Sequence, residues 1–214
     1  MKKKNIILGS IAFVLCSIMI VLVCFFMIPR ISYGYDSKTD TYYVDVVYGN
    51  AASYEIESEI NGKPVTKIKS RAFMNKSGLE HITFSESLIE IERLSFMGCR
   101  NLKEISLEHI QVLGRNAFEG CESLEKVTLT LENIPGGAFI GCSNLKVIEL
   151  NNTRRIGSYA FSGVGAIEIS IPETCIEIGT DTFYDCRNLE KIFVYSPYLT
   201  EDKYLASLKN VVFM

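Results

Sequence analysis

An aromatic residue returns at nearly constant spacing through most of the chain. The intervals are 23, 22, 21, 22 and 22 residues, and the positions are Phe73, Phe96, Phe118, Phe139, Phe161 and Phe183. An aliphatic residue lies five positions before each phenylalanine, and most units continue with Leu-x-x-Ile-x-Leu or a close variant. Segments of this length cannot bury their own apolar side chains, so the units must stack and share one core. The pattern therefore predicts a solenoid.

Each unit contains two segments that predict β-strands. The Ile-x-Leu segment has period 2, so both apolar side chains point inward, and stacking one such strand per coil makes a parallel sheet. The aliphatic residue five positions before the phenylalanine opens a second short strand. The segment around the phenylalanine predicts a helical turn that ends at a glycine in the left-handed conformation. These glycines are Gly98, Gly120, Gly141 and Gly163.

The predicted repeats fill residues 65–214, as about six units plus a partial unit at the C-terminal end. The first unit has Lys76 where several others have cysteine, which suits an end position. Before the repeats, residues 41–64 contain two alternating segments that predict strands capping the exposed core of the first coil. Residues 29–40 show little periodicity and predict a flexible tether.

A run of 23 residues without charge, residues 6–28, follows the basic segment 1–5. As a helix this run spans about 34 Å, slightly more than a hydrocarbon core of about 30 Å. A cleaved signal peptide is the alternative, but the run is long and no small-x-small cleavage site follows it. We therefore predict an uncleaved signal-anchor, a transmembrane helix over 6–28. The lysines predict a cytoplasmic N-terminus, which leaves the repeats outside the cell.

The repeats resemble a known family. The segment from Ile60 to Thr66, followed by Ile68 and Ala72-Phe73, resembles the first repeat of BspA-type leucine-rich-repeat proteins. The later Ala-Phe-x-Gly-Cys-x-x-Leu-x-x-Ile-x-Leu units are similar to the repeats that follow in that family. The resemblance covers about residues 54–213. It implies an α/β-type repeat solenoid, a right-handed leucine-rich-repeat coil with a parallel β-sheet on one face and short strands and helical turns on the other. It also implies a bacterial surface location and, often, adhesion or protein binding. It names no partner, because the shared motif builds the scaffold.

Composition argues against nucleic-acid binding and catalysis. The chain has 22 basic and 25 acidic residues, and after residue 30 the balance is 18 against 25, a formal charge of −7. No polycationic surface for a phosphate backbone follows from this balance. The two histidines, His81 and His109, are not near any cysteine pair with the spacing of metal ligands. We therefore expect no enzyme activity, no cofactor and no metal site.

The seven cysteines do not predict a disulfide framework. Cys16 and Cys24 lie in the predicted membrane helix, and Cys175 takes the place of an aliphatic residue. The others share one phase of the repeat and are Cys99, Cys121, Cys142 and Cys186. A parallel ladder holds equivalent Cβ atoms about 4.8 Å or more apart and pointing the same way, which disfavours a bridge. We predict free buried thiols, with disulfides as the alternative.

The candidate binding surface is the outer face of the parallel sheet, on either side of each inward isoleucine. Much of it predicts a solvated face, with Glu104–Lys126 and Glu168–Lys191 ion pairs worth less than about 1 kcal/mol each. Apolar residues enter this face only toward its C-terminal end, beside mixed charge, which is typical of a contact patch. The candidate residues are Lys126, Val147, Glu149, Glu168, Lys191, Phe193 and Val212.

Two functions fit these features. The first is a non-enzymatic cell-surface module for protein–protein interaction or adhesion, held in a bacterial membrane by residues 6–28, with an envelope or host-surface protein as ligand. The alternative is a structural membrane-tethered spacer or a self-assembling envelope protein. It draws on the apolar strand residues between positions 205 and 213, which leave a sheet edge able to pair with another copy.

Overall fold

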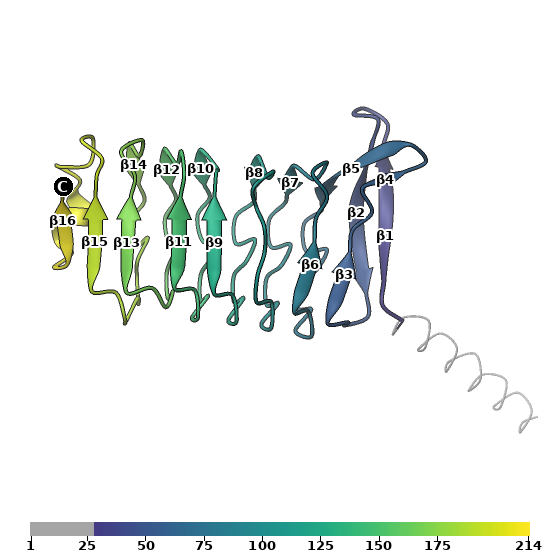
Figure 1. The fold of residues 1–214 in the computed structure, drawn as a ribbon, viewed down its shortest axis with the longest axis horizontal. Coiled ribbons are helices and arrows are strands. Elements are labelled where there is room, and N and C mark those ends of the chain that lie inside the picture. The colour runs from purple at the N-terminus through teal and green to yellow at the C-terminus, as the bar shows by residue number, and fades with distance from the viewer. Residues whose placement is uncertain (1–27) are drawn as a thin grey trace, which may run out of the picture.

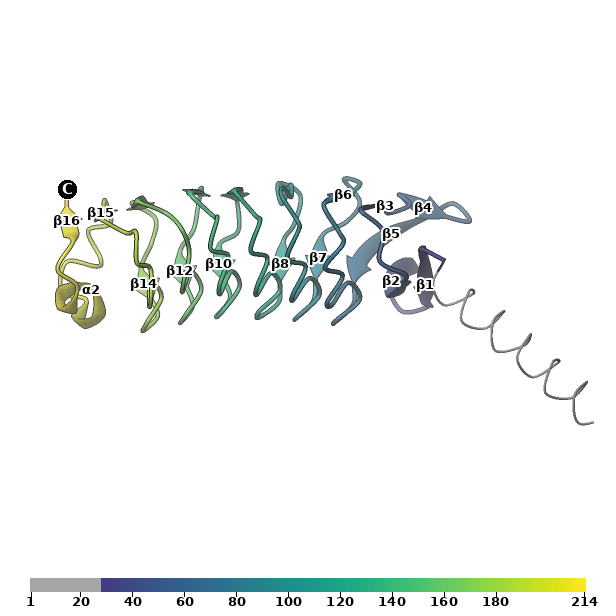
Figure 2. The ribbon, with the colours of Figure 1, turned by 90° about the horizontal axis from the view of Figure 1, so that it is seen from below.

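The computed structural model describes residues 28–214. These residues form a β-solenoid, in which short parallel strands stack coil on coil along one long axis (Figure 1). Two ladders of strands run along the axis and lie on opposite sides of the coils in Figure 2. We name them the front ladder, formed mainly by the Ile-x-Leu segments, and the back ladder, formed mainly by the short segments before each phenylalanine.

Neighbouring strands that pair within either ladder are parallel, and the pairing of the back ladder is broken between β8 and β10. The front ladder consists of β3 (Ser53–Glu55), β6 (His81–Thr83), β9 (Lys126–Leu129), β11 (Val147–Leu150), β13 (Glu168–Ile171), β15 (Lys191–Val194) and β16 (Val211–Phe213). The back ladder consists of β5 (Lys63–Ile68), β7 (Glu90–Ile91), β8 (Val112–Leu113), β10 (Asn133–Ile134), β12 (Arg155–Ile156) and β14 (Glu177–Ile178). The front ladder is interrupted between β6 and β9, where the expected Ile105–Leu107 strand is reduced to a single bridge between Glu104 and Lys126, and β11 does not pair with β13.

The segment around each phenylalanine is a hydrogen-bonded turn, with i to i−3 bonds such as that from the N–H of Cys99 to the carbonyl of Phe96 (3.1 Å), and it does not extend into a helix. The backbone N–H of Phe96 donates to Ala117 of the next coil (2.8 Å), and that of Gly98 donates to Glu119 (2.7 Å). Because the next coil accepts these donors, the backbone satisfies its polar groups without a helix. The one α-helix in residues 28–214 is α2 (Lys203–Ser207), which lies near the C-terminal end.

Two positions in each coil have left-handed backbone. One is the position of the predicted glycines, whose left-handed conformation is confirmed, with φ between +69° and +74°. The other lies two residues before each phenylalanine, and its occupants are Arg71, Leu94, Asn116, Gly137, Tyr159 and Asp181. A residue other than glycine pays about 1–2 kcal/mol in this conformation. The shared geometry therefore comes from coil stacking, which overrides the local preference of the side chain.

A stack of phenylalanine rings runs along the core. Neighbouring rings have centroids 4.8–6.3 Å apart and planes within 14° of parallel. Five of the six rings are fully buried, and Phe183 at the C-terminal end is 6% exposed. Because each ring packs between those of adjacent coils, the core is continuous, as the repeat predicts.

The N-terminal end of the solenoid is covered by a hairpin. β1 (Arg30–Asp36) pairs antiparallel with β2 (Thr41–Tyr48), and β2 pairs in parallel with β5. A third short strand, β4 (Glu59–Ile60), pairs antiparallel with β5. The flexible tether predicted for residues 29–40 is therefore wrong. Its polar residues hide an alternation in which Ile31 and Tyr33 pack against the core.

In the first coil, Lys76 occupies the position that cysteine takes in later coils. Its Nζ donates a hydrogen bond to the carbonyl of Gly49 at 2.6 Å, where later coils place a cysteine thiol. The predicted basic segment 1–5 and nearly all of the predicted membrane helix 6–28 lie outside the described residues. Within residues 28–214, no helix combines the length and apolar character needed to cross a membrane.

Candidate functional site

The front ladder brings all seven candidate residues onto one face of the solenoid. Its register places Lys126 beside Val147, and Glu168 beside Lys191. In the neighbouring row, Phe193 lies beside Val212. The strands that carry these residues follow one another in order along the axis in Figure 1. We call these seven residues the front patch.

The charged side chains of the front patch form local ion pairs. The predicted pair between Lys191 and Glu168 is present, with Nζ 3.7 Å from Oε1. The predicted pair between Glu104 and Lys126 is wrong, because Lys126 Nζ lies 2.6 Å from Oε1 of Glu149. The pKa of Glu149 is lowered mainly by its hydrogen bond from Lys126, and to a lesser degree by that from the Thr128 hydroxyl at 2.7 Å. Most charge on this face is therefore already paired.

The apolar part of the front patch is accessible to a partner. Val147 is 44% exposed and Val212 is 38% exposed. Phe193 is half-buried, yet it does not belong to the core cluster or to the side chains packed against that cluster. Burying such side chains against another protein gains about 25 cal/mol per Å² of apolar area. The geometry suits contact with a protein surface.

The interruption between β6 and β9 creates a hollow that the repeat pattern does not reveal. Its volume is about 500 Å³, and its lining includes Phe84, Glu104, Ser106 and Lys126. The second unit carries the same apolar residues as its neighbours, so its sequence predicts a regular strand here. The hollow adjoins the front patch, because Lys126 belongs to both.

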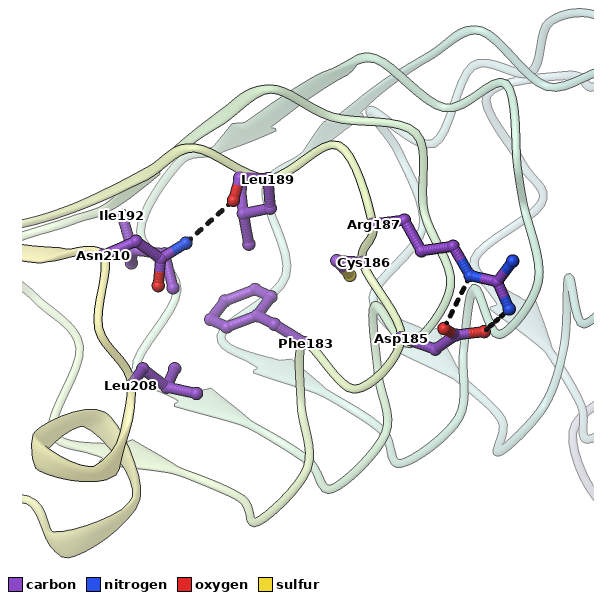
Figure 3. A pocket seen from close by; sticks show the side chains of 8 residues that line it. All are labelled: Phe183, Asp185, Cys186, Arg187, Leu189, Ile192, Leu208 and Asn210. Atoms are coloured by element: carbon purple, nitrogen blue, oxygen red, sulfur yellow. Dashed lines mark hydrogen bonds and ion pairs between the residues drawn. The ribbon is translucent and has the colours of Figure 1, made fainter.

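A second hollow, of about 270 Å³, lies beside the last ring of the phenylalanine stack (Figure 3). Phe183, Leu189 and Leu208 give it an apolar lining. At its edge, Nε of Arg187 donates to Asp185 at 2.9 Å. The corresponding leucines of the first four units are fully buried, whereas Leu189 is half-buried. The hollow therefore reflects incomplete coverage of the sixth coil.

The five cysteines in residues 28–214 are free, as predicted. Each of Cys99, Cys121 and Cys142 donates from Sγ to the phenylalanine carbonyl of the preceding coil, at 3.1–3.3 Å. Burial raises the pKa of Cys99 and of Cys142 to about 12. Because the thiolate is the reactive form, these thiols fill core positions and are unsuited to nucleophilic chemistry. Residues 28–214 also contain no group of three or more His, Cys, Asp or Glu side chains arranged to hold a metal ion.

We expect Cys99, Cys121 and Cys142 to resist a thiol reagent in the folded protein up to about pH 9, where an exposed thiol is largely ionised. The measurement is a thiol titration, first of the folded protein and then in denaturant, of a variant in which Cys16 and Cys24 are replaced by serine. In denaturant without reductant, all five remaining thiols should react, and reductant should add none. A lower count before reduction would show that some cysteines are bridged.

The repeats match a family model. Six copies of the BspA type leucine rich repeat region cover residues 66–190, more than half of the chain. The chain belongs to the BspA-type leucine-rich-repeat family. This confirms the family resemblance of the sequence, and the stacked parallel strands agree with it. No enzyme family is indicated, and a search of curated proteins finds no match.

Solved structures of bacterial proteins share the fold of this BspA-type repeat domain. A leucine rich cell surface protein from Faecalibacterium prausnitzii A2-165 is 24% identical, with a TM-score of 0.68, over 78% of this chain and 53% of that one. A leucine-rich repeat protein from Eubacterium ventriosum is 16% identical, with a TM-score of 0.58, over 80% and 53%. The T. pallidum leucine rich repeat protein is 23% identical, with a TM-score of 0.52, over 76% and 68%. The chain spans about half the length of the first two proteins.

Proposed function

We propose that this BspA-type repeat domain is a non-enzymatic protein-binding module on a bacterial surface, and that its partner is an envelope or host-surface protein. The observation that carries the proposal is the front patch, where exposed Val147 and Val212 and half-buried Phe193 share one sheet face and Phe193 lies beside Val212. The charge-free run of residues 6–28 supports attachment to the cell membrane, with the N-terminus inside. The name of the similar F. prausnitzii cell surface protein supports the same location.

The scaffold favours binding because it holds the front patch in one conformation. Strand pairing fixes the backbone of β11, β13 and β15, so a partner loses little conformational freedom of this domain on contact. Lys191 and Glu168 are exposed enough to exchange their mutual ion pair for pairs with a partner. Binding energy should concentrate at the aromatic side chain, as in other protein interfaces.

Replacing Lys191 and Phe193 with alanine together should weaken partner capture about tenfold or more, since central aromatic and charged contacts dominate interfaces. The measurement is in-cell photo-crosslinking from position 126, followed by mass identification of the adduct and quantification of its yield. The matched control replaces Val112 and Arg155 with alanine. These residues lie on the back ladder, where Val112 is 54% exposed, and their loss should leave the yield unchanged.

The identity of the adduct separates the two functions. A discrete adduct with another protein, lost in the front-patch variant only, supports a binding module. An adduct between two copies supports the alternative of a self-assembling element. That alternative rests on β16, the outermost strand of its sheet, where Val212 and Phe213 are 38% and 43% exposed. No adduct from position 126 or from position 193 would contradict a binding role for the front patch.

A further inference from the structure

Three arginines differ from all the others in the chain. Four of the eight arginines pair with a carboxylate, at 2.9–3.7 Å, and are Arg100, Arg154, Arg155 and Arg187. A fifth, Arg30, lies over the ring of Tyr48 at 4.2 Å. The remaining three are Arg71, Arg93 and Arg115. Their side chains are exposed, and within residues 28–214 they form no ion pair and no side-chain hydrogen bond.

These three arginines lie on consecutive coils at the same corner of the solenoid. Each is in the turn between a back-ladder strand, namely β5, β7 or β8, and the buried phenylalanine that follows. The N–H of Arg71 donates to the carbonyl of Arg93 at 3.3 Å, and that of Leu94 donates to Arg115 at 3.1 Å. These bonds align Arg71 with Leu94, so Arg93 and Arg115 occupy equivalent positions of adjacent coils, which stack about 4.8 Å apart, and Arg71 lies one position further along the turn of the preceding coil. We call this the arginine row.

The carboxylates nearest in sequence are already engaged. Glu92 accepts hydrogen bonds from the N–H and the hydroxyl of Ser70, both at 2.9 Å, and lies 3.7 Å from Nζ of Lys67. Glu119 accepts a hydrogen bond from Nδ2 of Asn116 at 2.8 Å. Three like charges in a row repel one another unless an anion is present. The arginine row is thus a local cationic stripe in a domain whose formal charge is −7.

A hollow of about 340 Å³ continues the arginine row in the next two coils. Arg115 and Asn116 form one wall, and Ser158 and Tyr159 form the other. The fourth unit has Gly136 and Gly137 at this corner, so these two positions place no side chain between the walls, and Ile140 of the same unit also lines the hollow. A Cβ on Gly137 would lie only 2.6 Å from Nδ2 of Asn116, so the glycine keeps the corner open.

The walls of this hollow combine two kinds of contact. Tyr159 is 43% exposed and presents an aromatic ring. Asn116 and Ser158 present amide and hydroxyl groups. An aromatic face beside a few polar groups suits a ligand that has apolar C–H surface and hydroxyls on one ring. A sugar ring has this chemistry, whereas a run of aspartate or glutamate residues has no ring to place there.

We propose that this corner binds a linear anionic glycan. Carboxylate or phosphate groups along the glycan pair with the guanidinium groups of the arginine row, which match such anions by two parallel hydrogen bonds. One sugar ring occupies the hollow against Tyr159 and accepts or donates hydrogen bonds at Asn116 and Ser158. This goes beyond protein binding by the front patch, since it uses a different side of the coil and a different class of ligand.

The first test uses the full chain and two linear probes, polygalacturonate and a polymer of sugar rings joined by phosphodiesters, with neutral dextran as a blank. The variant Arg71→Gln, Arg93→Gln, Arg115→Gln should raise Kd for the better probe about tenfold or more at low salt. The matched control is Arg100→Gln, Arg154→Gln, Arg155→Gln, which removes the same charge from ion-paired arginines. It should change Kd less than about twofold. The tighter of the two probes identifies the kind of anion.

The second test separates a glycan from other polyanions. Tyr159→Asn, a residue suited to left-handed backbone, should weaken the glycan probe and leave the binding of poly-L-glutamate unchanged. The proposal is overturned if both triple variants lose binding equally, since net charge alone would then explain it. It is also overturned if poly-L-glutamate or an oligothymidylate binds as tightly as the better glycan probe, or if neither glycan probe binds.

Discussion

Replacing Phe118 with alanine should destabilise the solenoid by about 3–5 kcal/mol, the usual cost of removing a buried aromatic ring. The ring is fully buried. It stacks on Phe96 at 5.2 Å on one side and on Phe139 at 5.5 Å on the other, with planes within 9° of parallel. Because a solenoid is held together by contacts between neighbouring coils, the cavity weakens two interfaces at once.

The measurement is urea unfolding of the purified chain, followed by circular dichroism. Phe193→Ala is the matched control, because the same side chain is removed from the sheet face, away from the core. It should cost less than about 1 kcal/mol. Equal losses for the two variants would contradict the view that the phenylalanine stack carries the stability of the coils.

Replacing Gly114 with alanine should cost about 3 kcal/mol, at the upper end for added volume in a packed site. A Cβ at this position would lie 2.2 Å from the backbone nitrogen of Arg93 and 2.4 Å from the carbonyl carbon of Glu92. Both atoms belong to the backbone of the preceding coil and cannot rotate away. The coils would have to separate, which would strain the bond from the N–H of Gly114 to the carbonyl of Ile91, now 2.7 Å.

Gly120→Ala is the matched control for this prediction. Its Cβ would have 3.8 Å to the nearest atoms, so only the left-handed backbone, with φ of +71°, opposes the change. The expected cost is about 1 kcal/mol. Thermal unfolding of both variants measures the difference. If Gly120→Ala proves the more destabilising, backbone conformation rather than coil spacing limits substitution in the turns.

The sequence predicts the features that recur at one position of every repeat, and it misses those that depend on contacts between coils or strands. The stacked coils and the left-handed glycines are predicted correctly, because phenylalanine and glycine each recur as one residue type at a fixed position of the repeat. The second left-handed position is not, since its occupants include Arg71, Leu94 and Tyr159, which carry no local preference for it. The strand β1 is missed because its alternation is short and its packing partner, β2, is required to reveal it.

The candidate surface shows the same division. Strand alternation alone places the seven residues of the front patch on one face. It does not choose between a direct and a diagonal partner, so it assigns Lys126 to Glu104 rather than to Glu149. The arginine row was also missed. Its residues occupy two different offsets from their phenylalanines, so no single position of the repeat marks them, and only the stacking of the coils brings them to one corner.

The direction of the backbone hydrogen bonds between coils has a mechanical consequence. They run along the long axis, and the N-terminal hairpin and the last strand lie at its two ends (Figure 1). A force applied between these ends therefore breaks the hydrogen bonds of one coil at a time, instead of shearing all the strands of a sheet together. Each coil that peels away releases about 22 residues, or roughly 75 Å of extended chain. Under tension, the domain is expected to lengthen in steps and to absorb force while its remaining coils stay folded.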